Sequence, residues 1–180
     1  MLKQSCEYNR LLEELGALGV CGGDVVLVHS SMKALGTSLT PDEVIDCLQA
    51  AVGEEGTLLF PALTYENVNQ AHPVFHSPTT QPCIGLLPRV FWQRPGVERS
   101  ENPTHSVCAW GRLAHRLTVS HAMDNTPVGP HSPFMLLPVV GGKLLGAECS
   151  LIDTRALLAA ALAEMRSNPY AFVTDISKWI

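Results

Sequence analysis

The sequence has little charge and no long apolar run. Charged residues make up 16% of its 180 residues, and the formal net charge at pH 7 is −5. Lys and Arg form no run, which argues against a surface that binds nucleic acid. Residues 1–7 lack the apolar core of a signal peptide, and even the apolar stretch 156–163 is too short to span a bilayer. These absences predict a cytoplasmic protein with neither nucleic-acid nor membrane partners.

The cysteines form no recognisable site. All six are scattered, with no Cys-x-x-Cys pair and no Cys/His cluster at the spacing of zinc ligands. Scattered thiols within apolar stretches are typical of proteins in a reducing compartment. The sequence therefore predicts structural cysteines, no bound metal and, again, a cytoplasmic location.

The first third of the chain alternates between helix and strand patterns. Leucines at helical spacing over 11–18 predict a helix, and the β-branched run 24–29 predicts a strand buried on both faces. Thr40 and Glu43 fit a capping box at the start of a second helix, and a second apolar strand follows at 56–61. Strands joined through helices imply crossover connections and a parallel arrangement.

The rest of the chain continues this pattern with two interruptions. Residues 64–82 and about 120–131 are polar loops containing prolines, and long loops in compact domains are often functional. The other expected elements are a helix at 86–91, a strand at 105–110, a helix near 112–117, a short helix from 132, a strand at 143–147 and a helix at 153–165. With 46% hydrophobic residues, the sequence predicts one α/β domain over 1–180, with a mostly parallel central sheet flanked by helices.

The first polar cluster follows the first predicted strand. Residues 28–36 contain His29, Ser30, Ser31 and Lys33. Ligands of open α/β sheets bind outside the carboxyl ends of the strands, and hydroxyls, turn amides and one cation there suit phosphate or pyrophosphate. The alternative is an ordinary polar turn, and the spacing of a Walker loop is absent.

Two further clusters carry histidines. In residues 99–107, His105 is either an acid/base group or a hydrogen-bonded core residue. His121 and the Pro/Gly-rich segment 127–133, which includes His131, predict a rigid turn, and only proximity to the other clusters would make this segment a site. A Ser/His/Asp hydrolase ranks last, because the Gly-x-Ser-x-Gly elbow is absent from the sequence.

Five stretches together resemble the aminoglycoside 3-N-acetyltransferase, or antibiotic N-acetyltransferase, family. They follow the family's order at about its spacing, over residues 5 to about 145, and they are VVLVHSSMKALG at 25–36, EGTLLFPA at 55–62, PGVERS at 95–100, NPTHSVCAWG at 102–111 and GPHSPF at 129–134. The resemblance implies an α/β fold distinct from that of the GNAT acetyltransferases. It also implies antibiotic-resistance chemistry, in which an acetyl group moves from acetyl-coenzyme A to the 3-amino group of an aminoglycoside, a small-molecule amine.

The same resemblance implies which residues contact the coenzyme. In the family, the loop after the first strand and the segment that leads into the later strand lie against it. The matching residues here are Ser30, Ser31, Lys33, Thr104, Ser106 and Val107.

The chain departs from the family at the catalytic base. Family members carry a histidine in an Asn-Thr-x-x-His motif, which deprotonates the amine so that its lone pair can attack the thioester. Here the sequence diverges from about residue 146. Asp153-Thr154 matches Asn-Thr, Leu157 or a neighbour takes the place of the histidine, and the sequence contains no histidine after His131.

Two interpretations of different classes follow from this departure. The first is an acetyl-coenzyme A-dependent N-acetyltransferase whose first candidate for the catalytic acid/base residue is His105. His29 and His131 are the next candidates for that role. The second is a catalytically impaired family member that binds coenzyme A or an aminoglycoside without efficient turnover. A shortened sheet would also expose an edge strand, so we expect that two copies could pair as a homodimer.

Overall fold

A six-stranded sheet in the order β3-β4-β2-β1-β5-β6 forms the centre of the computed structural model, which describes residues 6–29, 31–146 and 150–167. The strands are β1 (Val25–Val28), β2 (Thr57–Pro61), β3 (Glu98–Arg99), β4 (Val107–Gly111), β5 (Lys143–Leu145) and β6 (Leu151–Asp153). The helices are α1 (Cys6–Ala17), α2 (Met32–Leu35), α3 (Pro41–Val52), α4 (Leu86–Phe91), α5 (Ala114–Thr118), α6 (Pro133–Leu136), α7 (Thr154–Ser167) and the 3₁₀ turn η1 (His121–Met123).

The predicted α/β fold is confirmed, but the strand pairing is mixed. β1 pairs in parallel with β2 and β5, whereas β2–β4, β3–β4 and β5–β6 are antiparallel. The expectation of a mostly parallel sheet therefore holds only for the three central strands. Parallel neighbours need a crossover of a dozen or more residues. The connections at 100–106 and 146–150 are too short for one, so β3–β4 and β5–β6 form hairpins.

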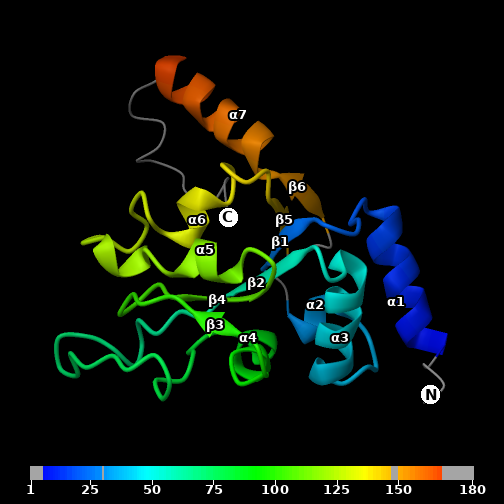
Figure 1. Ribbon diagram of the computed structural model, residues 1–180, viewed down its shortest axis with the longest axis horizontal. Coiled ribbons are helices and arrows are strands. Elements are labelled where there is room, and N and C mark those ends of the chain that lie inside the picture. Colours follow the sequence, from blue (N-terminus) through cyan, green and yellow to red (C-terminus); the bar gives the residue numbers. More distant parts are fainter. Residues whose placement is uncertain (1–5, 30, 147–149, 168–180) are drawn as a thin grey trace.

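Both faces of the sheet are buried, as the apolar strand patterns predict. Val26 and Val28 of β1 pack into a core under α1, α3 and α4, while Val25 and Leu27 pack into a second core under α5 and α6. Figure 1 shows these two groups of helices on opposite sides of the sheet. Successive side chains of a strand point to opposite faces, so one apolar run supplies both cores.

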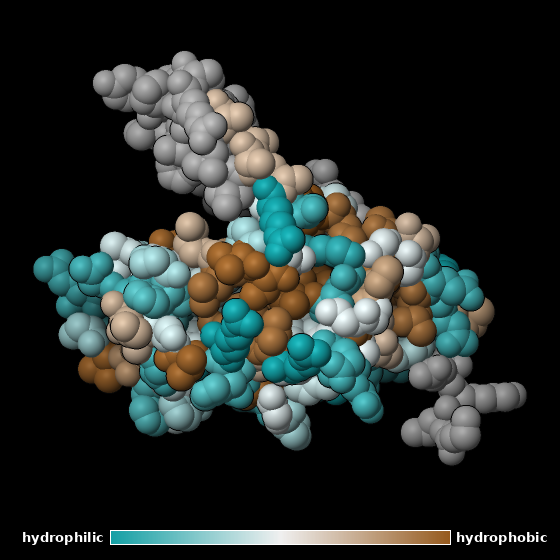
Figure 2. Space-filling view, turned by 45° about the horizontal axis from the view of Figure 1, so that its top comes forward, coloured by the Kyte–Doolittle hydropathy of each residue, from teal (hydrophilic) through white to brown (hydrophobic). Residues whose placement is uncertain are grey.

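The second core is covered by shorter helices than the first. Several of its apolar side chains remain partly exposed, namely Leu113, Phe134, Leu136, Val140 and Leu144. Figure 2 shows a contiguous apolar area on the body of the molecule beneath α7. This side of the sheet therefore has the thinner cover.

Local signals account well for the helix boundaries. At the start of α3, Thr40 Oγ1 accepts from the Glu43 amide at 3.3 Å and Glu43 Oε2 accepts from the Thr40 amide at 2.8 Å, which confirms the capping box. Asp153 Oδ1 accepts from the Arg155 amide at 2.8 Å, as expected for the residue that precedes α7. Residues 64–82 contain neither helix nor strand, in agreement with the predicted long loop.

The cysteines in the described part of the chain are unpaired. Cys47 and Cys108 are buried, as predicted for structural thiols, while Cys6 and Cys21 are exposed. Cys149 lies outside the described residues. Across those residues, none of the helices has the length and apolar character needed to cross a membrane.

Candidate active site

Three segments from distant parts of the sequence meet at one edge of the sheet. The carboxyl ends of β1 and β2 lie there because these strands are parallel. Since β4 is antiparallel to β2, with Pro61 opposite Val107, the turn that leads into β4 reaches the same edge. The clusters around Ser31 and His105 therefore share the edge at which open α/β sheets bind ligands.

The loop after β1 lines a small pocket. The pocket has a volume of about 180 Å³, and its walls include His29, Ser31, Pro61 and Gly85. Ser31 also caps α2, because its Oγ accepts from the Ala34 amide at 3.1 Å. The cation that the sequence predicts for this loop, on Lys33, is exposed, and Ser30 lies outside the described residues.

The turn before β4 is held by a buried amide side chain. Asn102 Oδ1 accepts from the backbone amides of Thr104 at 3.1 Å and His105 at 2.8 Å. The Thr64 amide donates to the Thr104 carbonyl at 2.9 Å, and the Thr64 hydroxyl donates to the Pro103 carbonyl at 2.6 Å. Hydrogen bonds therefore fix the turn from both sides.

His105 lies half-buried at the end of this turn. Its Nδ1 is 2.9 Å from Thr104 Oγ1, and its ring centroid is 6.3 Å from that of Tyr65. Burial lowers the pKa of His105, so the ring is neutral at pH 7 and can accept a proton. Its neighbours at hydrogen-bond distance in the described structure are uncharged, so an imidazolium formed there gains no carboxylate partner.

Ser106 and Val107 are fully buried and bonded within the protein. Ser106 Oγ donates to the Ala62 carbonyl at 2.7 Å, and the Val107 amide donates to Ser100 Oγ at 2.9 Å. These contacts join the turn to the end of β2. The predicted contact of both residues with a coenzyme stays a prediction, and a coenzyme would meet the backbone of the turn more readily than these side chains.

Arg99 belongs to the second polar cluster of the sequence, where no pattern indicates its role. Its guanidinium donates to Ser106 Oγ at 3.0 Å and to the carbonyls of Ala62 at 3.0 Å, Ser77 at 3.0 Å and Thr80 at 2.5 Å. The rings of Phe75 and Trp92 lie 5.3 and 5.2 Å from its central carbon. The side chain of Arg99 thus links the loop 64–82 to the end of β2 by hydrogen bonds. Burial lowers the pKa of the Arg99 guanidinium.

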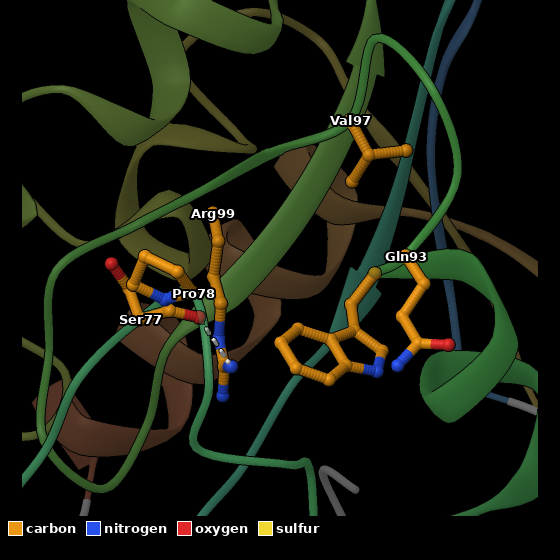
Figure 3. Close-up of a pocket in the computed structure, with 6 residues that line it drawn as sticks. Ser77, Pro78, Gln93, Val97 and Arg99 are labelled. Atoms are coloured by element: carbon orange, nitrogen blue, oxygen red, sulfur yellow. Dashed lines mark hydrogen bonds between the residues drawn. The ribbon is translucent and has the colours of Figure 1, made fainter.

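Arg99 also lines a second, wider pocket beside this loop. The pocket has a volume of about 430 Å³, and Figure 3 shows Ser77 and Arg99 joined on one side of it, with Gln93 and Val97 on the other. The wall of the pocket is therefore built partly by the contacts that hold the loop in place.

The third predicted cluster packs directly against the second. His121 is fully buried, with Nδ1 2.8 Å from Ser100 Oγ, and burial lowers its pKa. The side-chain Nδ2 of Asn102 donates to the Thr126 backbone carbonyl at 3.4 Å. These contacts place His121 and the start of the Pro/Gly-rich segment next to the second cluster.

Comparison with known proteins gives the same family as the sequence motifs. The model of the family described as aminoglycoside 3-N-acetyltransferase matches residues 27–165, more than half of the chain. Aminoglycoside N(3)-acetyltransferase VIII of Streptomyces fradiae is 35% identical over 188 residues, which cover 91% of this chain and 63% of the relative. Aminoglycoside N(3)-acetyltransferase VII of Streptomyces paromomycinus is 35% identical over 177 residues, covering 86% and 60%. The chain thus spans about three fifths of the length of these relatives.

Solved structures of the family match the fold of this chain. Aminoglycoside acetyltransferase AAC(3)-Xa matches with a TM-score of 0.70 and 33% identity, covering 77% of this chain and 54% of that one. AAC-IIIb in a binary complex with CoASH matches with a TM-score of 0.68 and 30% identity, covering 77% of this chain and 58% of that one. AAC-VIa bound to sisomicin matches with a TM-score of 0.68 and 28% identity, covering 79% of this chain and 59% of that one. From its sequence motifs, its fold and these matches, the chain belongs to the aminoglycoside 3-N-acetyltransferase family.

Proposed function

We propose that this protein transfers an acetyl group from acetyl-coenzyme A to an amino group of an aminoglycoside or a similar amine. The observation that carries the proposal is that the loop after β1 and the turn before β4, both family motifs, meet at one edge of the sheet. A family structure with CoASH bound supports the donor, and one with sisomicin bound supports the acceptor.

On the coenzyme side, the residues present fit a phosphate-bearing ligand. Ser31 lines the pocket at the end of β1, and Lys33, two residues further along the chain, is exposed, so a hydroxyl and a cation are available to a pyrophosphate. We propose that Ser30, Ser31 and Lys33 bind from one side and that the turn of Thr104, Ser106 and Val107 binds from the other.

On the acceptor side, the loop 64–82 and the turn before β4 carry exposed carboxylates. Glu66 and Glu101 are both exposed, and Glu101 Oε1 accepts a hydrogen bond from the Ser77 hydroxyl. Carboxylates at the rim of a site attract a polycationic aminoglycoside and bring it to the edge of the sheet. We propose this loop as one wall of the amine site.

The chemistry needs a base, because an ammonium group has no lone pair with which to attack a thioester. The family motif would place its histidine at Leu157 or a neighbour, and the sequence has no histidine there, so this part of the chain offers no imidazole as proton acceptor. A missing base typically costs ~10²–10⁴-fold in rate. We therefore expect slower turnover than in relatives that keep the motif, and a family member that binds its ligands without efficient turnover is the second candidate.

Isothermal titration with acetyl-coenzyme A, followed by thiol-release assays with a panel of deoxystreptamine aminoglycosides, tests the proposal. Binding with thiol release that depends on the aminoglycoside supports acetyl transfer. Binding without thiol release supports the second candidate, and the absence of both contradicts the proposal. An ester substrate tests the hydrolase alternative in the same assay series.

Two further expectations belong to the same proposal. The unpaired cysteines of the described residues agree with a cytoplasmic location, where thiols stay reduced. The sheet has β3 and β6 at its edges, and an exposed edge strand can pair with a second copy. Cytoplasmic location and homodimer formation both stay predictions, and sedimentation of the purified protein tests the second.

A further inference from the structure

A buried carboxylate lies against a partly exposed histidine in the loop 120–131. The side chain of Asp124 is 1% exposed and that of His131 is 40% exposed. Asp124 Oδ1 is 2.8 Å from His131 Nδ1, and Asp124 Oδ2 accepts from the His131 backbone amide at 3.0 Å. Two donors of a single residue therefore hold the carboxylate in place.

Close packing keeps this carboxylate from moving. Gly129 lies so near that a Cβ on it would stand 2.4 Å from Asp124 Cγ, which is inside van der Waals contact. Burial opposes ionisation of Asp124, but the hydrogen bonds from the side chain and the backbone of His131 outweigh burial and lower its pKa. The pair is thus a fixed carboxylate beside an imidazole.

This arrangement determines which nitrogen of His131 can act. An ionised carboxylate only accepts hydrogen bonds, so Nδ1 carries the proton that it donates to Asp124. The lone pair is then on Nε2, on a side chain that is 40% exposed and can meet a ligand. A carboxylate that fixes the tautomer and stabilises the imidazolium is the device by which histidine bases are activated.

The loop that carries the pair is anchored beside the turn before β4. The contacts of His121 with Ser100 and of Asn102 with Thr126 join the two segments. Asn102 in turn holds the amide of His105. In Figure 1 the loop 120–131 extends from the face covered by α5 and α6 and the loop 64–82 from the face covered by α4, and both lie at the left of the view. The loop that carries His131 is therefore attached to the turn before β4, where the donor and the amine are proposed to meet.

Two other histidines, His105 and His115, fit the role of base less well. His105 has a threonine hydroxyl at Nδ1 in place of a carboxylate. His115 pairs with Glu98 at 2.9 Å, but these side chains are 75% and 44% exposed. Glu98 also lies opposite Ala109, beyond the start of β4 and toward the other end of the sheet. Of these three histidines, only His131 has both a buried carboxylate partner and a loop that is attached to the proposed site.

We propose that His131 Nε2 is the proton acceptor of the acetyl transfer and that Asp124 is its positioning residue. The inference rests on the proposed function. The ammonium nitrogen loses one proton to Nε2, which passes it to solvent, and the neutral amine then forms a bond to the thioester carbonyl carbon. As the carbon–sulfur bond breaks, a second proton passes from the nitrogen through Nε2 to the coenzyme thiolate, which leaves an amide, a free thiol and neutral His131.

The test compares His131→Gln, Asp124→Asn and the control His115→Gln, which removes the exposed His–Glu pair. Each variant is assayed for thiol release with acetyl-coenzyme A and an aminoglycoside across the pH range, for coenzyme affinity and for thermal stability. His131→Gln should lower kcat by ~10²-fold or more, abolish the fall of kcat at acid pH and leave the coenzyme Kd unchanged. Asp124→Asn should lower kcat roughly tenfold or more, because the tautomer is no longer fixed. His115→Gln should match the wild type.

The outcomes separate the two proposals. If His131→Gln keeps the kcat and the pH profile of the wild type, His131 is not the base, and the proposed acetyl transfer is unaffected. Coenzyme binding without thiol release in the wild-type protein overturns catalysis, and the base with it, while the binding site stands. If Asp124→Asn does not fold, His131→Gln decides alone, because its side chain is partly exposed and its backbone contact with Asp124 is retained.

Discussion

Arg99 Nε donates a hydrogen bond to Ser106 Oγ at 3.0 Å, and the same guanidinium binds three backbone carbonyls. Two of these carbonyls, of Ser77 and Thr80, belong to the long loop, and the third, of Ala62, follows β2. The turn before β4 and one wall of the proposed amine site therefore share one anchor. A change at Arg99 should disturb both at once.

Arg99→Lys should lower the free energy of unfolding by about 2–3 kcal/mol, because an ammonium cannot reproduce the planar fork that serves four acceptors. Urea denaturation measures this loss. Arg112→Lys is the matched control, since Arg112 pairs with Glu55 at 2.7 Å while both side chains are mostly exposed. That change should cost roughly 0.5 kcal/mol or less. Equal losses in the two variants would contradict the anchoring role of Arg99.

The coenzyme site gives a second prediction. Lys33→Ala should weaken the affinity for coenzyme A by up to about tenfold, or on the order of 1 kcal/mol, because the lysine is exposed and its contact with a phosphate is partly screened. Isothermal titration measures the change, and added salt should reduce the difference between variant and wild type. Arg116→Ala removes an exposed cation of α5 and serves as the control. Unchanged affinity in Lys33→Ala would remove this loop from the coenzyme site.

Much of the fold follows from local patterns in the sequence. The apolar runs at β1 and β2 and the capping box of Thr40 and Glu43 predict elements whose causes lie within a few residues. The pairing of the outer strands could not be predicted in this way. β3 is a two-residue polar strand with no alternation of its own, and it becomes a strand only because β4 lies beside it.

The candidate site, like the fold, could be predicted from the sequence only in part. Proximity of the first two clusters follows from the rule that ligands bind at the carboxyl ends of strands, and the structure brings the described residues of these clusters to one edge. The pairing of Asp124 with His131 had no sequence signal, because a segment rich in Pro and Gly predicts a turn but not which side chains meet. The anchoring by Arg99 had none either, since three of its four acceptors are backbone carbonyls scattered over residues 62–80.

Glu7 gives a prediction about pH. Its carboxylate accepts from the Thr37 hydroxyl and the Ser38 amide, each at 2.9 Å, and from the Ser38 hydroxyl. The side-chain hydrogen bond with Ser38, followed by the backbone bond, lowers the pKa of Glu7 from 4.5 to about 2. A folded-state pKa below the unfolded one stabilises the protein above the unfolded value, and this stabilisation is lost as the pH falls toward the folded one.

Glu7→Gln should therefore be less stable than the wild type at neutral pH, and the gap should close as the pH falls from 4.5 to about 2. Urea denaturation over a pH series measures the gap. Glu14→Gln removes only an exposed pair with Arg10 and should follow the wild type at each pH. A gap that is constant with pH would show that Glu7 acts through packing and not through its charge.

The last prediction tests the pair of Asp124 and His131 without changing a titratable group. Gly129→Ala places a methyl group 2.4 Å from Asp124 Cγ, and the carboxylate cannot retreat because it is buried and bonded to His131. Such overpacking costs about 1–3 kcal/mol. We expect lower stability together with a loss of kcat like that of Asp124→Asn, at unchanged coenzyme affinity.

Gly16→Ala is the matched control, because its added Cβ meets nothing within 4 Å inside α1. Alanine in a helix is favoured over glycine by roughly 0.5–1 kcal/mol, so this change should raise stability and leave kcat alone. The two Gly→Ala variants should thus shift the melting temperature in opposite directions. A positioning role of Asp124 requires the rate to change with the geometry of its pair with His131. A Gly129→Ala protein that is destabilised but keeps the wild-type kcat and pH profile would therefore show that Asp124 only stabilises the conformation of the loop 120–131.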